Sequence, residues 1–442
     1  MTAAPSTGAQ AVPHVPPVGP GERVLRALGS MRLSVWLVLL LMLQVLLGTF
    51  AQSWLAIQDV QRDFFESWFV VGELPISFWG KPLWPDEFNQ PWRLRIPIPG
   101  GYPVMLLLAV NLVVGGLVRI KWSARTAGIL VTHIGILFLL VASFVKMHFS
   151  YAGMLGVFET PADGNLLPGR VYETSRIVSS YADELVLLVD RGDAIEERTV
   201  PEQQLWGARN DGIVTVSAEG LPFTVQVEHW VDHSRALPKG PMVRSLLPEV
   251  DGAFLQAATW PPGEQPQAEQ EYSGCYVTVR PNSGEPLKAI LRSTRREPFE
   301  SSRYPWTFTV AGQRYGLDLR RVTLDLPFKI KLDKFQKRDH PGTLSPMDFR
   351  SYVTVRDGTS TQEAQIFMNN PLRRDGYVVF QSNWGPQPMG GPPWYSIFEV
   401  ANNPSDLWPM LACFVIAAGL LLHFGMKLRR FLRSSAVTRA EV

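Results

Sequence analysis

The stretch "RTAGILVTHIGILFLLVASFVKMHF", from Arg125 to Phe149, decides the fold class of this chain. Residues 126–145 within it are free of charge, and their number matches the roughly 20 apolar residues that a helix needs to cross a bilayer. His133 lies inside this apolar run. An imidazole is costly to bury in hydrocarbon, so an ionisable side chain at this depth usually faces something that uses it. The stretch therefore predicts a membrane-spanning helix and one candidate functional residue.

Three further apolar stretches have the length of membrane spans. They run from Leu33 to Phe50, from Pro103 to Val118 and from Leu407 to Met426. The second is slightly short unless the residues before it contribute. Four spans in one chain predict an integral membrane protein.

Basic residues fix the orientation of these spans. They gather before the first span, between the second and third, and after the fourth: Arg23, Arg26, Arg32, Arg119, Lys121, Arg125, Lys427, Arg429, Arg430 and Arg433. Since basic loops stay in the cytoplasm, both termini are expected there. The sequence thus predicts a multi-pass protein of the plasma (inner) membrane, with its largest segment on the outer side.

The segment between the third and fourth spans reads as β structure. In "RVTLDLPFKIKLDKF", which starts at Arg321, apolar and polar residues alternate as in a half-buried strand. Pro327 interrupts this run and predicts an edge strand or a bulge. No long helical period appears in the segment, so we expect a large extracytoplasmic β-rich domain, sandwich or barrel-like.

These features divide the chain into five expected parts. They are a disordered, Pro/Ala-rich cytoplasmic N-terminus (1–30), a three-span membrane region (31–146) with an aromatic-rich outside loop (51–102), the extracytoplasmic β-rich domain (147–405), the fourth transmembrane helix (406–426) and a basic cytoplasmic tail (427–442).

Composition excludes several functions. The net charge of +2 and the lack of a basic block argue against nucleic acid as a partner. Cys275 and Cys413 are far apart and form no C-x-x-C or C-x-x-C-H motif, which argues against a thiol oxidoreductase or a c-type cytochrome. No nucleophile triad or nucleotide-binding motif appears, so we assign no catalytic residue and expect no enzyme activity from the chain alone.

Several motifs resemble the ResB family of cytochrome c biogenesis proteins. "MRLSVWLVLLLMLQVLLGTFAQ" is similar to the family's first span, with Gly48 and Thr49 closing the helix, and "VTHIGILFLLVAS" is similar to its third span. The strongest resemblance lies in "LPFKIKLDKFQKRDHPGTLSPMDFRSYVTVRDG" and "IFMNNPLRRDGYVVFQSNW". The matching residues there are Pro341, Gly342, Thr343, Phe349, Ser351, Val353, Met368, Asn369, Pro371, Leu372, Gly376, Tyr377, Gln381 and Ser382.

The resemblance implies a function in system II, as a CcsB-type subunit of a cytochrome c assembly complex. Such a subunit works with a CcsA- or ResC-type haem-loop membrane protein, carries haem across the bilayer and supports its attachment to apocytochrome c outside. The haem is bound transiently as haem b, and the family's third-span histidine, at the position of His133, is its axial ligand. The chain has no tryptophan-rich haem loop of its own, so attachment is expected only in the complex.

The two candidate histidines and the function also have simpler explanations. His133 lies about 12 Å from the Arg125 edge, where it would equally serve to hydrogen-bond a neighbouring helix. His423 is a second haem-ligand candidate, but an interfacial position beside Lys427 explains it more simply. The alternative function is a membrane-anchored sensor or scaffold whose β domain binds an extracellular ligand, and a sensor would have no need of His133.

Overall fold

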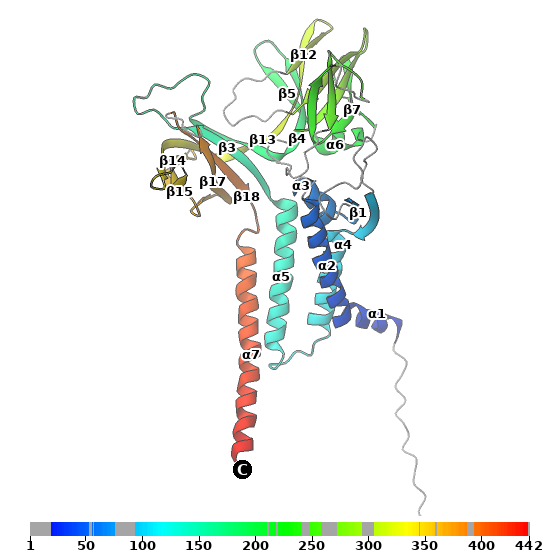
Figure 1. The fold of residues 1–442 in the computed structure, drawn as a ribbon, viewed down its shortest axis with the longest axis vertical. Helices are drawn as coiled ribbons and strands as arrows, with labels where there is room; N and C mark the ends of the chain where they lie inside the picture. The colour runs from blue at the N-terminus through cyan, green and yellow to red at the C-terminus, as the bar shows by residue number, and fades with distance from the viewer. Residues whose placement is uncertain are drawn as a thin grey trace, which may run out of the picture. The chain divides into compact units, whose positions relative to one another are not determined.

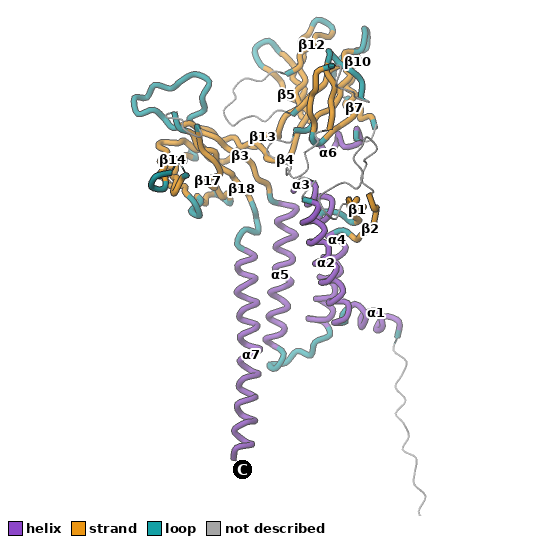
Figure 2. The backbone as a smooth tube through the Cα atoms, viewed as in Figure 1, coloured by secondary structure: helices purple, strands orange, loops and turns teal. Residues whose placement is uncertain are grey.

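The structure, a computed structural model, falls into two compact units (Figures 1 and 2). The membrane unit comprises residues 1–49, 62–144 and 405–442, and the β unit comprises residues 50–61 and 145–404. The described residues are 19–52, 55, 57–75, 93–209, 212–217, 220–240, 247–257, 272–293, 305–343, 345–358, 360–386 and 393–440, without the side chains of 58, 71–75, 93–96 and 434–440.

Among the described residues, four helices are long and apolar enough to cross a membrane, which confirms the prediction of four spans. They are α2 (Met31–Ala51), α4 (Gly101–Val113) continued by the π-helix η2 (Val114–Val118), α5 (Ala127–Phe149) and α7 (Trp408–Ala440). Between α2 and α4 lie α3 (Ile57–Val60), the π-helix η1 (Gln61–Phe65) and the hairpin of β1 (Phe69–Pro75) and β2 (Arg93–Pro99).

Both chain ends differ from the prediction. Residues 1–30 were expected to be disordered, but Pro20–Leu28 form helix α1, which starts with a proline and ends where the Gly29 N–H bonds the Leu25 carbonyl. Residues 1–18 lie outside the described part of the chain. The expected tail from residue 427 continues α7 as far as Ala440, because no Gly or Pro follows Gly425 to end the helix.

Small residues bring the spans close together. A Cβ atom at Gly128 of α5 would lie 2.5 Å from the backbone N of His423 in α7, and one at Gly135 would lie 2.7 Å from Cγ1 of Ile416. The Ser405 hydroxyl donates to the carbonyl of Ala142 at 2.9 Å. Small residues at such an interface let helix backbones approach, which is how helices associate in a bilayer.

The buried Asn111 has a structural role. Its Nδ2 donates to the carbonyls of Leu28 and Ser30 at 2.5 and 3.1 Å, and its Oδ1 accepts the Ser34 hydroxyl at 2.6 Å. These bonds join α4 to the start of α2 and satisfy an amide that would otherwise be costly in an apolar environment.

The β unit contains antiparallel strands in two main sheets. One has the order β11-β10-β7-β6, and the other has the order β15-β14-β13-β4-β3-β18-β17-β16 with β12 on β13 and β5 on β4. The strands are β3 (Tyr151–Phe158), β4 (Glu173–Asp190), β5 (Ile195–Pro201), β6 (Ile213–Val216), β7 (Phe223–Val231), β8 (Ser234–Pro238), β9 (Ala253–Ala257), β10 (Gly274–Pro281), β11 (Leu287–Arg292), β12 (Trp306–Val310), β13 (Gln313–Asp339), β14 (Pro346–Arg356), β15 (Thr361–Phe367), β16 (Leu372–Arg374), β17 (Tyr377–Gly385) and β18 (Tyr395–Asn402). A short α6 (Glu202–Leu205) and a 3₁₀ turn η3 (Trp206–Ala208) follow β5, and β8 pairs with β9.

The long strands β4 and β13 serve two hydrophobic cores. Leu317 and Leu319 of β13 belong to the core shared with the four-stranded sheet, whereas Phe328 and Ile330 belong to a second core lined by β14, β17 and β18. Between these parts the pairing of β13 with β4 shifts register around Pro327, which confirms the predicted bulge.

The expected shape of the β domain was a sandwich or a barrel. The first core is a sandwich of two sheets, while around the second core one sheet curls on itself (Figure 2). Among the described strands, β15 and β16 end this sheet without pairing with each other, so no closed barrel forms.

Three polar residues tie the two arms of the curled sheet together. The Ser351 hydroxyl on β14 donates to Oε1 of Gln381 on β17 at 2.5 Å and lies 2.7 Å from the Ser396 hydroxyl on β18. Ser351 and Ser396 are fully buried. Since β14 is not a neighbour of β17 or β18 in the sheet, these bonds hold the curl across the core.

We expect Ser351→Ala to lower the free energy of unfolding by about 1–3 kcal/mol, because the buried Ser396 hydroxyl and the half-buried Gln381 amide would each lose a partner. Urea unfolding of the purified protein in detergent measures this change. Thr361→Ala on the exposed edge strand β15 is the control and should change stability by less than about 0.5 kcal/mol. Equal effects of the two substitutions would show that the Ser351 bonds do not hold the curl.

Candidate functional site

His133 is half-buried on α5, and one of its ring nitrogens is already engaged. Nδ1 lies 2.7 Å from the carbonyl oxygen of Ile129, one helical turn earlier. Because a carbonyl can only accept, Nδ1 carries the proton. In the tautomer with its proton on Nδ1, Nε2 keeps the lone pair, and this is the form of histidine that binds a metal.

The partner of the His133 ring is a glycine on another span. A Cβ atom at Gly116 would lie 2.3 Å from Cδ2 and 3.1 Å from Nε2 of His133, so the imidazole occupies the space that a side chain would need. Gly116 belongs to the π-helical turn η2. A π turn inserts a residue into a helix and changes which side chains face the neighbour, and such turns are frequent at functional sites.

His423, the second candidate, has different neighbours. Its backbone packs on Gly128 of α5, and its ring lies edge-on to Phe424 with 5.4 Å between the ring centroids. His133 instead faces η2. The structure thus puts the two imidazoles in different surroundings, and nothing in their contacts makes them a pair.

A histidine of the β unit makes a contact that the sequence did not predict. Nε2 of His233 lies 2.6 Å from Oδ2 of Asp59, which is 174 residues away in the chain. Asp59 belongs to the short α3 helix, so this pair fastens the segment after α2 to the end of β7. His229 lies in strand β7.

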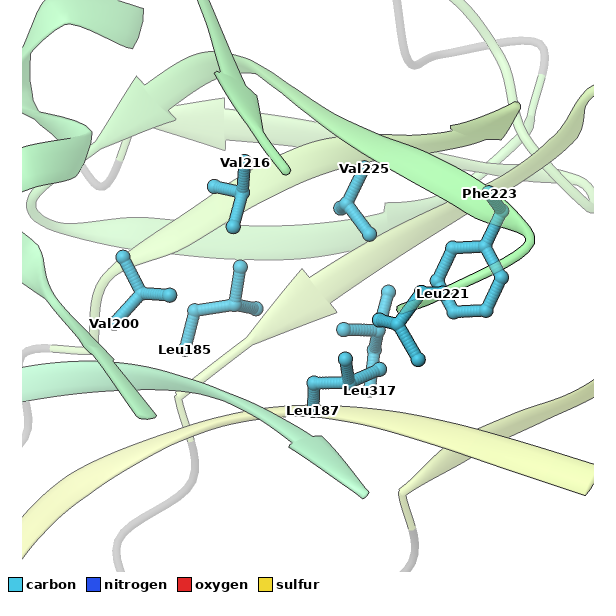
Figure 3. Close-up of a pocket in the computed structure, with 8 residues that line it drawn as sticks. All are labelled: Leu185, Leu187, Val200, Val216, Leu221, Phe223, Val225 and Leu317. Atoms are coloured by element: carbon cyan, nitrogen blue, oxygen red, sulfur yellow. The ribbon is translucent and has the colours of Figure 1, made fainter. Parts of the chain in front are cut away.

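The β unit holds a small apolar cavity, drawn in Figure 3. Its volume is about 20 Å³, and it lies inside the sandwich core. The lining side chains are all apolar: Leu185, Leu187, Val200, Val216, Leu221, Phe223, Val225 and Leu317. A space of this size holds at most one water and the lining offers it no polar partner, so the cavity is a packing gap rather than a ligand site.

A group of charged residues is buried at the centre of β4 and β13. Asp183 accepts the Ser293 hydroxyl at 2.6 Å and pairs with Nη1 of Arg321 at 3.3 Å. Its backbone N–H donates to Oε2 of Glu202 at 3.1 Å. Burial raises the pKa of Asp183, and burial together with the nearby Asp183 carboxylate raises the pKa of Glu202 to about 7.

Cys275 lies in β10 beside this group and is fully buried. Burial raises the pKa of its thiol to about 12. The thiolate, which is the reactive form, is thus disfavoured, and Cys275 serves packing.

The raised pKa of Glu202 predicts a pH-dependent stability. Between pH 4.5, its ordinary pKa, and about pH 7, the unfolded chain loses the proton while the folded protein keeps it, so stability falls as the pH rises. We expect this side chain to contribute about 2 kcal/mol to the fall, which Glu202→Gln should remove. Thermal unfolding of both proteins at pH 5 and pH 8 measures the difference. A variant as pH-dependent as the wild type would contradict the assignment to Glu202.

A match to a family model lies in the second half of the β unit. The model of the ResB-like family matches residues 307–392. Protein NrfI of Wolinella succinogenes is 35% identical over 100 residues, which cover 22% of this chain and 10% of that protein. The cytochrome c biogenesis protein CcsB of a Synechococcus species is 37% identical over 73 residues, or 16% of each chain. The alignments thus cover a small part of each relative's own length.

The residues that the family model matches lie in one part of the β unit. They run from β12 through β17 and include the long strand β13 and the buried bridge of Ser351 and Gln381. The resemblance in the motifs around these residues is therefore confirmed where the sheet curls. The similarity to the ResB-like family thus lies in residues 307–392.

Proposed function

We propose that this protein is a subunit of a cytochrome c assembly complex that carries haem across the membrane and supports its attachment to apocytochrome c. The observation that carries the proposal is the match of residues 307–392 to the ResB-like family, together with the identity to a protein named for cytochrome c biogenesis.

In this proposal haem is cargo and His133 is its axial ligand. The Ile129 carbonyl holds the proton on Nδ1, and Nε2 keeps the lone pair that binds iron. Gly116 gives the ring its position by leaving the space it occupies. The residues present thus fit a ligand for transiently bound haem b, whereas His423 has no comparable support.

The complex needs a second membrane protein. We propose a CcsA- or ResC-type protein with a tryptophan-rich haem loop, since this sequence has no such loop of its own. The β unit and the loop after α2 would lie on the outer side, with apocytochrome c, and the basic ends of the spans would face the cytoplasm. The chain itself has no assigned catalytic residue.

Deletion of this protein from its host tests the proposal. We expect c-type cytochromes to lose covalently bound haem, as seen by haem staining of denaturing gels, while the apocytochrome polypeptides are still made. Haem b proteins of the same membranes are the control and should keep their absorption. Normal covalent haem in the deletion strain would contradict the proposal and favour a sensor or scaffold.

A further inference from the structure

Helix α1 is too short to be stable without a surface to pack on. It has nine residues, Pro20–Leu28, and the described part of the chain buries none of them. Isolated helices of fewer than about 12 residues are marginal in water, and helices in proteins are stabilised chiefly by packing of an apolar face. A surface outside the described chain is therefore expected to cover α1.

The residues of α1 separate into two faces. Successive residues of a helix are rotated by about 100°, which places the large apolar side chains, Val24, Leu25 and Leu28, on one side. The other side is formed by Glu22, Arg23 and Arg26. Val24 and Leu25 are 56% and 45% exposed in the chain. A short helix with one apolar and one charged face is typical of helices that lie in a membrane surface.

The end of α1 lies at the depth where the second span ends. Gly29, the residue after α1, packs on η2, since a Cβ atom there would lie 3.0 Å from Cα of Gly115. Nη1 of Arg119 donates to the carbonyls of Arg26 and Gly29, both at 3.4 Å. Arg119 is the first charged residue after this span, and Trp122, three residues later, is 74% exposed. Basic residues and exposed tryptophan mark the membrane–water interface, so α1 ends at headgroup level.

The direction of α1 suits this depth. Only Gly29 and Ser30 join α1 to the span α2, and Figure 1 shows α1 turned sideways from the axis of α2. A helix that turns away from a spanning helix at headgroup level runs along the bilayer. The lipid that surrounds the spans is then within reach of the whole apolar face of α1.

Basic residues dominate this end of the first three spans. Residues 19–32 and 119–126 contain six of them: Arg23, Arg26, Arg32, Arg119, Lys121 and Arg125. Glu22 is the single acid of these two segments, and it pairs with Arg26 at 2.5 Å. Each basic residue close to an anionic membrane surface contributes about 1 kcal/mol of attraction. The charge of this region therefore favours anionic over zwitterionic headgroups.

We infer that α1 lies in the membrane surface and binds anionic lipid. Val24, Leu25 and Leu28 enter the boundary between headgroups and acyl chains, where burial of their apolar area stabilises the short helix. The charged face of α1 meets the lipid phosphates, and the bonds of Arg119 hold the end of the helix at this level.

Fluorescent labels on the full chain, reconstituted in lipid vesicles, test this position. In a Cys413→Ser background the remaining Cys275 is fully buried. Val24→Cys places the label on the apolar face, and Glu22→Cys places it on the charged face of the same turn as the matched control. The vesicles contain phosphatidylcholine and phosphatidylglycerol. Nitroxides on the acyl chains just below the headgroups should quench the label at position 24 at least about threefold more than the label at position 22, and iodide in the water should do the reverse.

Spin-labelled lipids with different headgroups test the preference for anionic lipid. At equal content, spin-labelled phosphatidylglycerol should quench the label at position 24 severalfold more than spin-labelled phosphatidylcholine, and high salt should weaken this preference by screening the charges. Arg23→Gln with Arg32→Gln should remove most of the preference. Arg314→Gln with Lys329→Gln, which changes two exposed cations of the β unit, is the matched control and should leave it unchanged. Equal quenching by the two lipids would contradict binding of anionic lipid.

A substitution in the apolar face tests how α1 is held. Leu25→Asp should make the label at position 24 accessible to iodide, because a carboxylate is costly to bury among acyl chains, whereas Leu25→Met should keep the label shielded. Equal access of iodide to positions 22 and 24 in the unsubstituted helix would show that α1 lies in water and would overturn the inference. Shielding of position 24 from both iodide and the lipid nitroxides would also overturn it, since a protein surface would then cover α1.

Discussion

Gly116→Leu should remove bound haem as completely as His133→Ala, although leucine is among the best residues for a membrane helix. A Cβ atom at position 116 would lie 2.3 Å from Cδ2 of His133, and contacts below 3 Å force the ring to move. The ring cannot move freely while Nδ1 stays bonded to the Ile129 carbonyl. Nε2 would therefore leave the position in which it would bind iron in the proposed function, and we expect at least a tenfold loss of haem.

The haem absorption spectrum of the protein purified with its partner measures this effect. Free imidazole should restore the spectrum of His133→Ala, because it fills the vacated iron ligand position, but should not restore Gly116→Leu, where the leucine side chain stays in the site. Ile134→Leu, on the exposed side of α5 next to His133, is the matched control and should keep its haem. Full haem content in Gly116→Leu would show that the position of the ring against η2 does not matter. Full haem content in His133→Ala would show that His133 is not the haem ligand.

Arg321→Met should be among the most destabilising substitutions in the β unit. It leaves Asp183, whose side chain is fully buried, without the cation that faces it at 3.3 Å. Breaking a buried ion pair from one side costs about 3–5 kcal/mol, because the remaining charge has no compensation. Urea unfolding of the protein in detergent, followed by tryptophan fluorescence, measures the loss.

Two controls make this prediction specific. Arg176 and Asp325 also join β4 to β13, at 3.4 Å, but their side chains are 66% and 74% exposed. Arg176→Met should therefore cost less than about 1 kcal/mol. The double variant Asp183→Asn with Arg321→Met should recover much of the stability, because neither charge of the pair remains. A similar loss of unfolding free energy in Arg176→Met and Arg321→Met would show that burial does not determine how much the Arg321–Asp183 pair contributes to stability.

The local patterns of the sequence determined most of the architecture. Four apolar runs gave four membrane helices, since the length of a span is fixed by the thickness of the bilayer. Alternation in "RVTLDLPFKIKLDKF" gave the strand, and Pro327 gave its bulge, because each follows from the geometry of one element. These local patterns did not predict helix α1 or the extension of α7, because charged residues interrupt the apolar pattern there.

Only the tertiary structure decided which residues meet. His133 is visible in the sequence as a polar residue in a span, but its contact with Gly116 depends on the rotation of two helices and on the π turn of η2. The pairing of Asp183 with Arg321 joins residues 138 positions apart. A shift of one residue in the register of β4 and β13 would turn these side chains to opposite faces, and no local pattern of sequence fixes that register. The sequence by itself therefore determined the elements and the place of His133 within a span, whereas packing between elements decided the surroundings of His133 and of the buried charges.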